Sequence, residues 1–183
     1  MIKADCVVAG CRALATCRGP IPKRRDALKD AGVVENAWLA GRDGRIVFIG
    51  SEEEFRRTVR PEPGAAAIDA RGLVGFPGFV DAHTHLPFAG SRGDEFSLRL
   101  QGWTYQQLAA RGMGIRSTVR ATRAATREEL RGLCLARLDE MLLHGTTTAE
   151  AKSGYGLNRD DEIKQLEAVR DADALHPVDL IPT

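Results

Sequence analysis

The stretch that decides the fold is FPGFVDAHTH, which runs from Phe76 to His85. Residues 73–83 are apolar at both odd and even positions, a pattern typical of a parallel strand that is buried on both faces. His83 and His85 come at the carboxyl end of this strand. Because alternate residues of a strand project to the same side, the two imidazoles are expected to converge, as two ligands of a transition metal must. The sequence therefore predicts a metal-binding pair at the strand end where α/β folds place their chemistry.

Alternating helix and strand patterns follow this stretch. Thr126 opens a capping-box pattern, and apolar residues then recur at helical spacing as far as Gly145. Residues 146–151 predict a second strand, residues 160–175 a second helix and residues 178–183 a third strand. This order predicts parallel strands joined by crossover helices.

The first 70 residues have a different pattern. Short apolar runs at 7–9, 37–40 and 46–49 are separated by turn residues. Asp43-Gly44 lies between the last two runs and favours a tight hairpin. The sequence predicts a small antiparallel β unit here, in which the basic segment 18–29 is a solvated loop.

Composition excludes several classes of protein. The 183 residues include 26 Lys and Arg against 25 Asp and Glu, so a formal net charge of +1 provides no field to attract nucleic acid or an anionic membrane. No stretch is apolar enough for a membrane helix. The four cysteines have neither CxxC nor dense disulfide spacing. We therefore expect a cytoplasmic globular protein that binds neither nucleic acid nor membranes.

Several motifs resemble one family. FPGFVDAHTH resembles the first-strand motif of the metal-dependent amidohydrolase superfamily, and DGRIVFIG at 43–50 resembles the N-terminal β-sandwich hairpin of that superfamily. Within it, the chain resembles the imidazolonepropionase family from about Ala4 onward. The most specific segment is KSGYGL at 152–157, and the others are FAGSR at 88–92, RLQG at 99–102 and STVRATR at 117–123. The resemblance implies metal-dependent hydrolysis of 4-imidazolone-5-propanoate to N-formimino-L-glutamate in histidine degradation.

The same resemblance implies a fold of the α/β class. Residues 1–71 would be the N-terminal portion of a composite β-sandwich domain. Residues 72–183 would be the first three strands and intervening helices of a hydrolase (β/α)8 TIM barrel. A closed barrel normally takes about 250 residues, so the barrel is expected to be incomplete in this chain.

The resemblance also implies roles for individual residues. His83 and His85 would bind one ion of zinc or iron. Arg92 would hold a substrate carboxylate, which suits a guanidinium fork, although a surface salt bridge is the alternative. Tyr155 would hydrogen-bond the substrate ring or its propanoate, although it could instead anchor its loop. The remaining metal ligands and the catalytic acid/base are expected beyond Thr183.

The expected partner is a small-molecule substrate, and a homodimer of the full-length enzyme is left open. Two other functions remain as alternatives. One is a related cyclic amidohydrolase or deaminase that acts on another small ring, and the other is a truncated remnant without activity. Because the barrel and its ligand set would be incomplete, we expect the chain by itself to be inactive.

Overall fold

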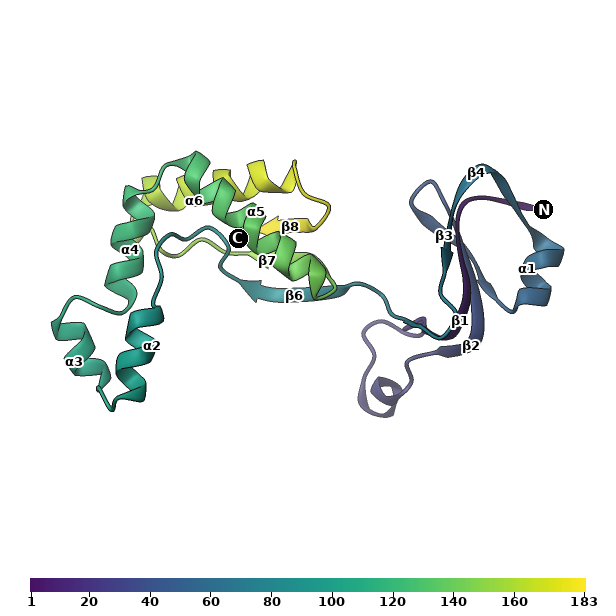
Figure 1. The fold of residues 1–183 in the computed structure, drawn as a ribbon, viewed down its shortest axis with the longest axis horizontal. Helices are drawn as coiled ribbons and strands as arrows, with labels where there is room; N and C mark the ends of the chain where they lie inside the picture. The colour runs from purple at the N-terminus through teal and green to yellow at the C-terminus, as the bar shows by residue number, and fades with distance from the viewer. The chain divides into compact units, whose positions relative to one another are not determined.

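The computed structural model describes residues 1–183 and divides into two compact units, Met1–Pro77 and Gly78–Thr183 (Figure 1). Each unit has its own sheet and its own buried apolar core.

The first unit is built on a five-stranded sheet with the order β3-β2-β1-β4, and a short fifth strand also pairs with β1. β2 is antiparallel to β1 and to β3, whereas β4 and β5 run parallel to β1. The expectation of an antiparallel unit is confirmed for the first three strands and is wrong for β4 and β5. The strands are β1 (Ile2–Ala15), β2 (Val33–Arg42), β3 (Arg45–Gly50), β4 (Val59–Asp69) and β5 (Val74–Gly75).

The hairpin between β2 and β3 has the predicted turn. Asp43 and Gly44 both have positive φ, at 51° and 72°. Two consecutive residues in this region match the right-handed twist of the flanking strands, and Gly44 adopts it without a Cβ clash. The segment 18–29, expected to be a solvated loop, is mostly exposed and contains only the short 3-10 helix η1 (Arg25–Lys29).

Helix α1 (Glu52–Thr58) was not expected from the sequence. Ser51 caps its amino end, and its apolar residue Phe55 is buried. The ring of Phe55 lies 4.9 Å from that of Trp38 and 5.7 Å from that of Phe48, measured between centroids. A single aromatic anchor on the sheet therefore fixes a helix that is too short to show an apolar periodicity.

Strand β4 was also missed, because its sequence contains Pro61, Pro63 and Gly64, which are depleted in strands. The register between β1 and β4 shifts between Ala4 and Cys6. This irregularity accommodates the proline-containing part at the edge of the sheet, where a missing N–H leaves no neighbour unpaired.

The second unit has a three-stranded parallel sheet with the order β6-β7-β8. Helices α5 and α6 connect these strands, so the predicted strand-helix order and the parallel pairing are confirmed. Three further helices lie between β6 and α5, where no element was expected. The elements are β6 (Phe79–Thr84), α2 (Gly93–Leu100), α3 (Tyr105–Ala110), α4 (Ile115–Ala124), α5 (Arg127–Leu143), β7 (Thr146–Ala151), α6 (Arg159–Asp173) and β8 (Asp179–Pro182).

Helices α5 and α6 cover one face of this sheet, as Figure 1 shows. Ala149 and Ala151 of β7 are fully buried beneath them, and the apolar residues of both helices complete the core. Arg127 of α5 joins the two helices through paired bonds of 2.6 and 2.7 Å to the carboxylate of Asp171 on α6. The opposite face of the sheet carries the polar side chain of Glu150.

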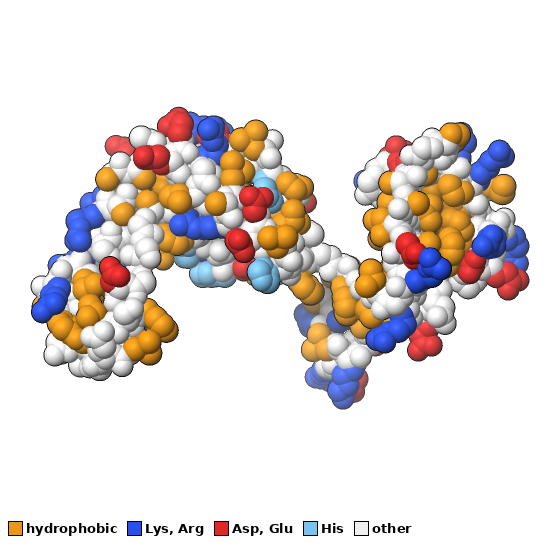
Figure 2. All heavy atoms as spheres, in the orientation of Figure 1, with side chains coloured by type: hydrophobic (Ala, Val, Ile, Leu, Met, Phe, Trp, Pro, Cys, Tyr) orange, Lys and Arg blue, Asp and Glu red, His pale blue; other side chains and the backbone are white.

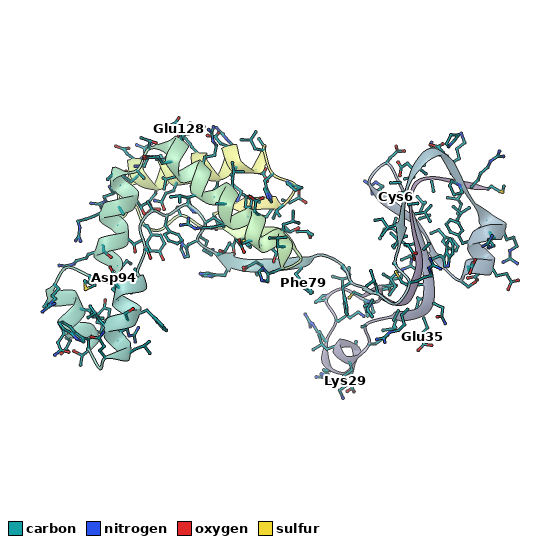
Figure 3. The ribbon with its side chains drawn as sticks, in the orientation of Figure 1. Cys6, Lys29, Glu35, Phe79, Asp94 and Glu128 are labelled. Atoms are coloured by element: carbon teal, nitrogen blue, oxygen red, sulfur yellow. The ribbon has the colours of Figure 1, made fainter.

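The stretch 73–83 is not the single buried strand that its apolar pattern predicts. It forms β5 in the first unit and β6 in the second, because Pro77 has no N–H to donate and interrupts the pairing. Phe79, which Figure 3 places at the start of β6, is 57% exposed and Val80 is 69% exposed. Because these neighbouring side chains point to opposite faces and both are exposed, the expectation that this strand is buried on both faces is wrong.

Charged residues of both signs are interspersed on the visible face of each unit (Figure 2). No helix combines the length and the apolar character needed to span a bilayer.

A capping box closes the amino end of α5. The hydroxyl of Thr126 accepts a bond of 3.2 Å from the N–H of Glu129, whose carboxylate accepts one of 2.8 Å from the N–H of Thr126. Thr126→Ala should lower the free energy of unfolding by about 1 kcal/mol in chemical denaturation. Thr126→Ser keeps the hydroxyl, so its free energy of unfolding should fall much less. Equal losses in both variants would contradict a role of the cap.

Candidate active site

The two histidines of the HxH motif lie together at the end of β6. Their ring centroids are 5.5 Å apart with the planes at 63°, and His83 is exposed while His85 is half-buried. The Asp81 carboxylate accepts a bond of 3.0 Å from the backbone N–H of His83 and shapes the strand end. The structure thus brings together the two residues that the sequence singled out as metal ligands.

The arrangement fits two ligands of one metal ion. Nδ1 of His85 is buried and has no hydrogen-bond partner, which costs about 1–3 kcal/mol unless another group satisfies it. An ion about 2.0–2.1 Å from one nitrogen of each imidazole would hold the ring centroids roughly 5 Å apart, close to the observed spacing. No group of three or more His, Cys, Asp or Glu residues is arranged to hold a metal. Catalytic zinc generally takes three protein ligands, so this pair would supply two of such a set.

Tyr155 packs directly against this pair. Its ring centroid lies 5.4 Å from that of His85 and 5.7 Å from that of Phe88. The preceding Gly154 has φ of +130°, and a Cβ at this position would lie 3.1 Å from Cε1 of His85. The glycine is therefore required both for the backbone conformation and for the close approach of the loop to the imidazole.

Arg137 of α5 holds the segment that follows the histidines, and sequence reasoning missed it. Its guanidinium lies 3.6 Å from the ring centroid of Phe88 and donates to the carbonyl oxygens of Phe88, at 2.8 Å, and Leu86. Partial burial lowers the pKa of Arg137. A cation–π contact with two carbonyl bonds fixes the backbone next to His85.

Arg92, the predicted carboxylate-binding residue, precedes α2 and forms an ion pair. Its Nε donates to the Glu95 carboxylate at 2.9 Å, and Glu95 is only 5% exposed. Glu95 also accepts from the backbone N–H of Gly114 and from the Ser117 hydroxyl. The salt-bridge alternative is thus present in the structure, but it uses only one of the guanidinium nitrogens, and Arg92 forms no hydrogen bond with Tyr155.

A second ionic pair lies at the end of β7. Nζ of Lys152 donates to the Glu150 carboxylate at 2.6 Å, and the Thr183 hydroxyl donates to it at 3.0 Å. These two bonds lower the pKa of Glu150. Glu150 is consequently an ionised acceptor.

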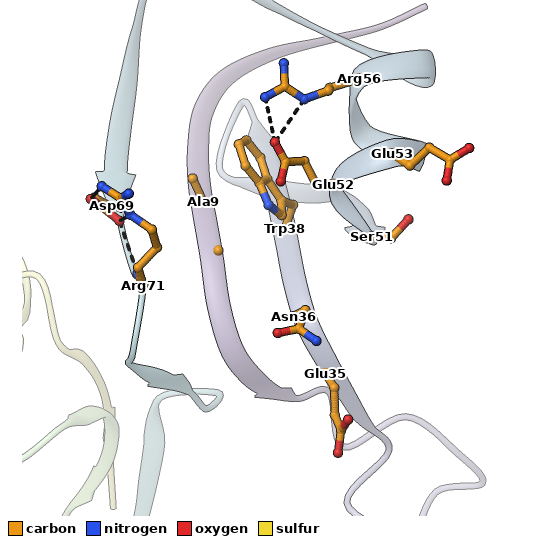
Figure 4. Close-up of a pocket in the computed structure, with 11 residues that line it drawn as sticks. Ala9, Glu35, Asn36, Trp38, Ser51, Glu52, Glu53, Arg56, Asp69 and Arg71 are labelled. Carbon is orange, nitrogen blue, oxygen red and sulfur yellow. Dashed lines mark hydrogen bonds and ion pairs between the residues drawn. The ribbon is translucent and has the colours of Figure 1, made fainter.

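A cavity of about 860 Å³ lies in the first unit (Figure 4). Two ion pairs line it, Glu52 with Arg56 at 2.6 Å and Asp69 with Arg71 at 2.5 Å. The hydrogen bonds from Arg71 lower the pKa of Asp69 to about 2. No predicted site residue lines this cavity, so the chemistry indicated by the sequence lies elsewhere.

Curated proteins of one name match this chain over its whole length. No protein-family model matches it. An imidazolonepropionase of Symbiobacterium thermophilum is 54% identical over 183 residues, covering 100% of this chain and 43% of that protein. An imidazolonepropionase of Haloarcula marismortui is 44% identical over 183 residues, covering 100% and 42%. The chain is therefore similar to imidazolonepropionases over its whole length. It spans about two fifths of the length of the curated relatives that it matches.

Solved structures of other proteins share the fold of this chain. Guanine deaminase of E. coli matches with a TM-score of 0.61 at 20% identity, over 97% of this chain and 36% of that one. The zinc complex of an atrazine chlorohydrolase from Arthrobacter aurescens TC1 matches with a TM-score of 0.56 at 18% identity, over 97% and 35%. These neighbours are amidohydrolase TIM-barrel enzymes, which confirms the expected fold class of an incomplete barrel.

The pair of Arg92 and Glu95 predicts a pH dependence. Burial raises the pKa of Glu95, but the bonds from Gly114, Arg92 and Ser117 outweigh it and hold the pKa below 4.5. A lowered folded-state pKa contributes stability that is complete above the unfolded value and is lost as the pH falls through the folded value.

Glu95→Gln should therefore be less stable than the wild type at neutral pH, and the gap should close as the medium is acidified below about pH 4.5. Thermal denaturation of both proteins at neutral and acidic pH measures this difference in stability. Asp94→Asn, in the same helical turn, serves as the control. A gap that is independent of pH would show that Glu95 acts only through its shape.

Proposed function

We propose that this protein is an imidazolonepropionase, which hydrolyses 4-imidazolone-5-propanoate to N-formimino-L-glutamate in histidine degradation. The observation that carries the proposal is the contact of Tyr155, within KSGYGL, with His85 of the metal motif. A residue from the family's most specific segment thus adjoins a candidate metal ligand. The relatives named above supply the identity of the substrate.

His83 and His85 would hold one ion of zinc or iron in this function. A bound divalent ion supplies Lewis acidity and lowers the pKa of a coordinated water toward neutrality. The protein's part is to hold both imidazoles in place. Gly154 packs against His85 on one side, and Arg137 fixes the backbone that follows it.

The substrate has two ends, and the chain offers a group for each. Tyr155 has a hydroxyl that can donate to or accept from the ring nitrogens and carbonyl. Arg92 suits the propanoate carboxylate, because a guanidinium meets a carboxylate through two parallel bonds. Since Glu95 engages Nε, the terminal nitrogens of Arg92 are left for this purpose.

The proposal includes a cytoplasmic location and a small-molecule substrate as partner. Cys6, Cys11, Cys17 and Cys134 are free thiols, which agrees with a reducing compartment. A related cyclic amidohydrolase or deaminase that acts on another small ring remains the alternative. The structures named above are at most 20% identical to this chain and support the fold alone.

Steady-state hydrolysis of 4-imidazolone-5-propanoate by the protein at its full natural length tests the proposal. Arg92→Ala should raise KM by roughly 10- to 100-fold with a smaller change in kcat, because the carboxylate is bound in both the ground and transition states. His83→Ala should abolish turnover together with metal content. Arg116→Ala, which removes an exposed arginine elsewhere in this unit, is the control. Turnover of guanine or a triazine in place of the imidazolone would contradict the proposal.

A further inference from the structure

The loop that carries Tyr155 is held by side chains of α6. Glu162 accepts bonds from three backbone N–H groups of this loop: those of Gly154 at 2.6 Å, Gly156 at 2.9 Å and Leu157 at 2.7 Å. One carboxylate therefore satisfies three amides within four consecutive residues. No other side chain of the second unit accepts as many bonds from a single loop.

Gln165, one turn further along α6, completes the attachment. It is fully buried, and its Oε1 accepts from the N–H of Tyr155 at 3.3 Å. Its Nε2 donates to the backbone oxygen of Asp161 at 2.9 Å, which fixes the orientation of the amide. Four consecutive amides, from Gly154 to Leu157, thus bond to side chains of one helix.

Steric contacts confine the loop from two sides. A Cβ at Gly156 would lie 2.6 Å from the N atom of Glu162, so the loop backbone packs directly on the first turn of α6. On the other side Gly154 faces His85. The loop backbone therefore lies between the first turn of α6 and the imidazole of His85, and Tyr155 is part of this loop.

We propose that Glu162 is a positioning residue, whose carboxylate folds the 153–157 loop into the shape that places the Tyr155 ring beside His85. The inference deepens the proposed function, because it assigns the residue that orients the substrate-binding tyrosine. Glu162 acts through the loop and does not itself contact the substrate.

The chemistry requires a carboxylate at this position. An ionised carboxylate is acceptor-only and can take three N–H bonds, whereas an amide would direct its NH₂ at one of the loop donors. Burial raises the pKa of Glu162, but bonds from Ser153 and from the Leu157, Gly154 and Gly156 amides outweigh it and lower the pKa below its ordinary value. The group is consequently charged at neutral pH, and its bonds are of the stronger, charge-assisted kind.

Hydrogen exchange and ring-to-ring NOEs, measured by NMR on the 183-residue chain, test the proposal without any assay of activity. In Glu162→Gln, the amides of Gly154, Gly156 and Leu157 should exchange on the order of 10- to 100-fold faster. The NOE between the Tyr155 and His85 rings should weaken or vanish. Unchanged amide exchange together with an unchanged NOE would overturn the proposal.

Two further variants control this measurement. Asp160→Asn removes the same charge from the same first turn of α6 but leaves the loop bonds intact, so its exchange should equal that of the wild type. Glu162→Asp keeps the charge and shortens the side chain by one methylene, so its loop amides should exchange at an intermediate rate. This variant provides the test if Glu162→Gln fails to fold. Faster loop exchange in Asp160→Asn equal to that in Glu162→Gln would assign the effect to the charge at the helix terminus and overturn the proposal.

Kinetics of the full-length protein separate positioning from general stability. Glu162→Gln should raise KM for the imidazolone substrate by about 10-fold or more at unchanged metal content, and should add little in a Tyr155→Phe background. If the two substitutions raised KM by independent factors that multiply in the double variant, action of Glu162 through Tyr155 would be contradicted. If the wild type hydrolyses no imidazolone, the proposed function fails, whereas the exchange and NOE results still decide the role of Glu162.

Discussion

The second unit depends on the packing of two helices against one face of β7. Ala149 and Ala151 are fully buried under α5 and α6, and the small side chains allow both helices to approach the strand. Because side chains alternate along a strand, Glu150 between them must lie on the other face. The apolar side chains of Ala149 and Ala151 and the polar side chain of Glu150 are thereby separated onto opposite faces within three residues.

The site is then fixed by the two segments that leave those carboxyl ends. Arg137 of α5 holds the segment after β6, and Glu162 of α6 holds the loop after β7. Both residues belong to the helices that cover the core, so the placement of His85 and Tyr155 is tied to the packing of the whole unit. Such support from rigid elements is what a site needs to keep its groups in a productive geometry.

Local signals in the sequence predicted much of this arrangement. Asp43-Gly44 and Thr126 each act within a few residues, and the structure confirms the turn and the cap they predict. The proximity of His83 and His85 follows from the two-residue period of a strand. The interruption at Pro77 was missed because an apolar run shows burial tendency but not the partner of each strand.

Features that depend on distant partners were not predictable from the sequence. Arg137 bonds to the carbonyls of Leu86 and Phe88, 51 and 49 residues away along the chain, and no spacing rule connects it to either. Glu162 looks like any acidic residue in the first turn of a helix, where such residues are common for electrostatic reasons. Only the folded loop shows that its carboxylate has a second role.

The central claim is that His83 and His85 act as two ligands of one ion. Titration of the ¹⁵N-labelled chain with Zn²⁺, followed through the imidazole nitrogen signals, tests it most directly. His144 and His176, which bond to Glu140 and Asp139, provide internal references for the four histidines of the chain. The signals of His83 and His85 should shift together along one binding curve while the references stay unchanged. Separate curves for His83 and His85, or a shift in only one of them, would contradict the account.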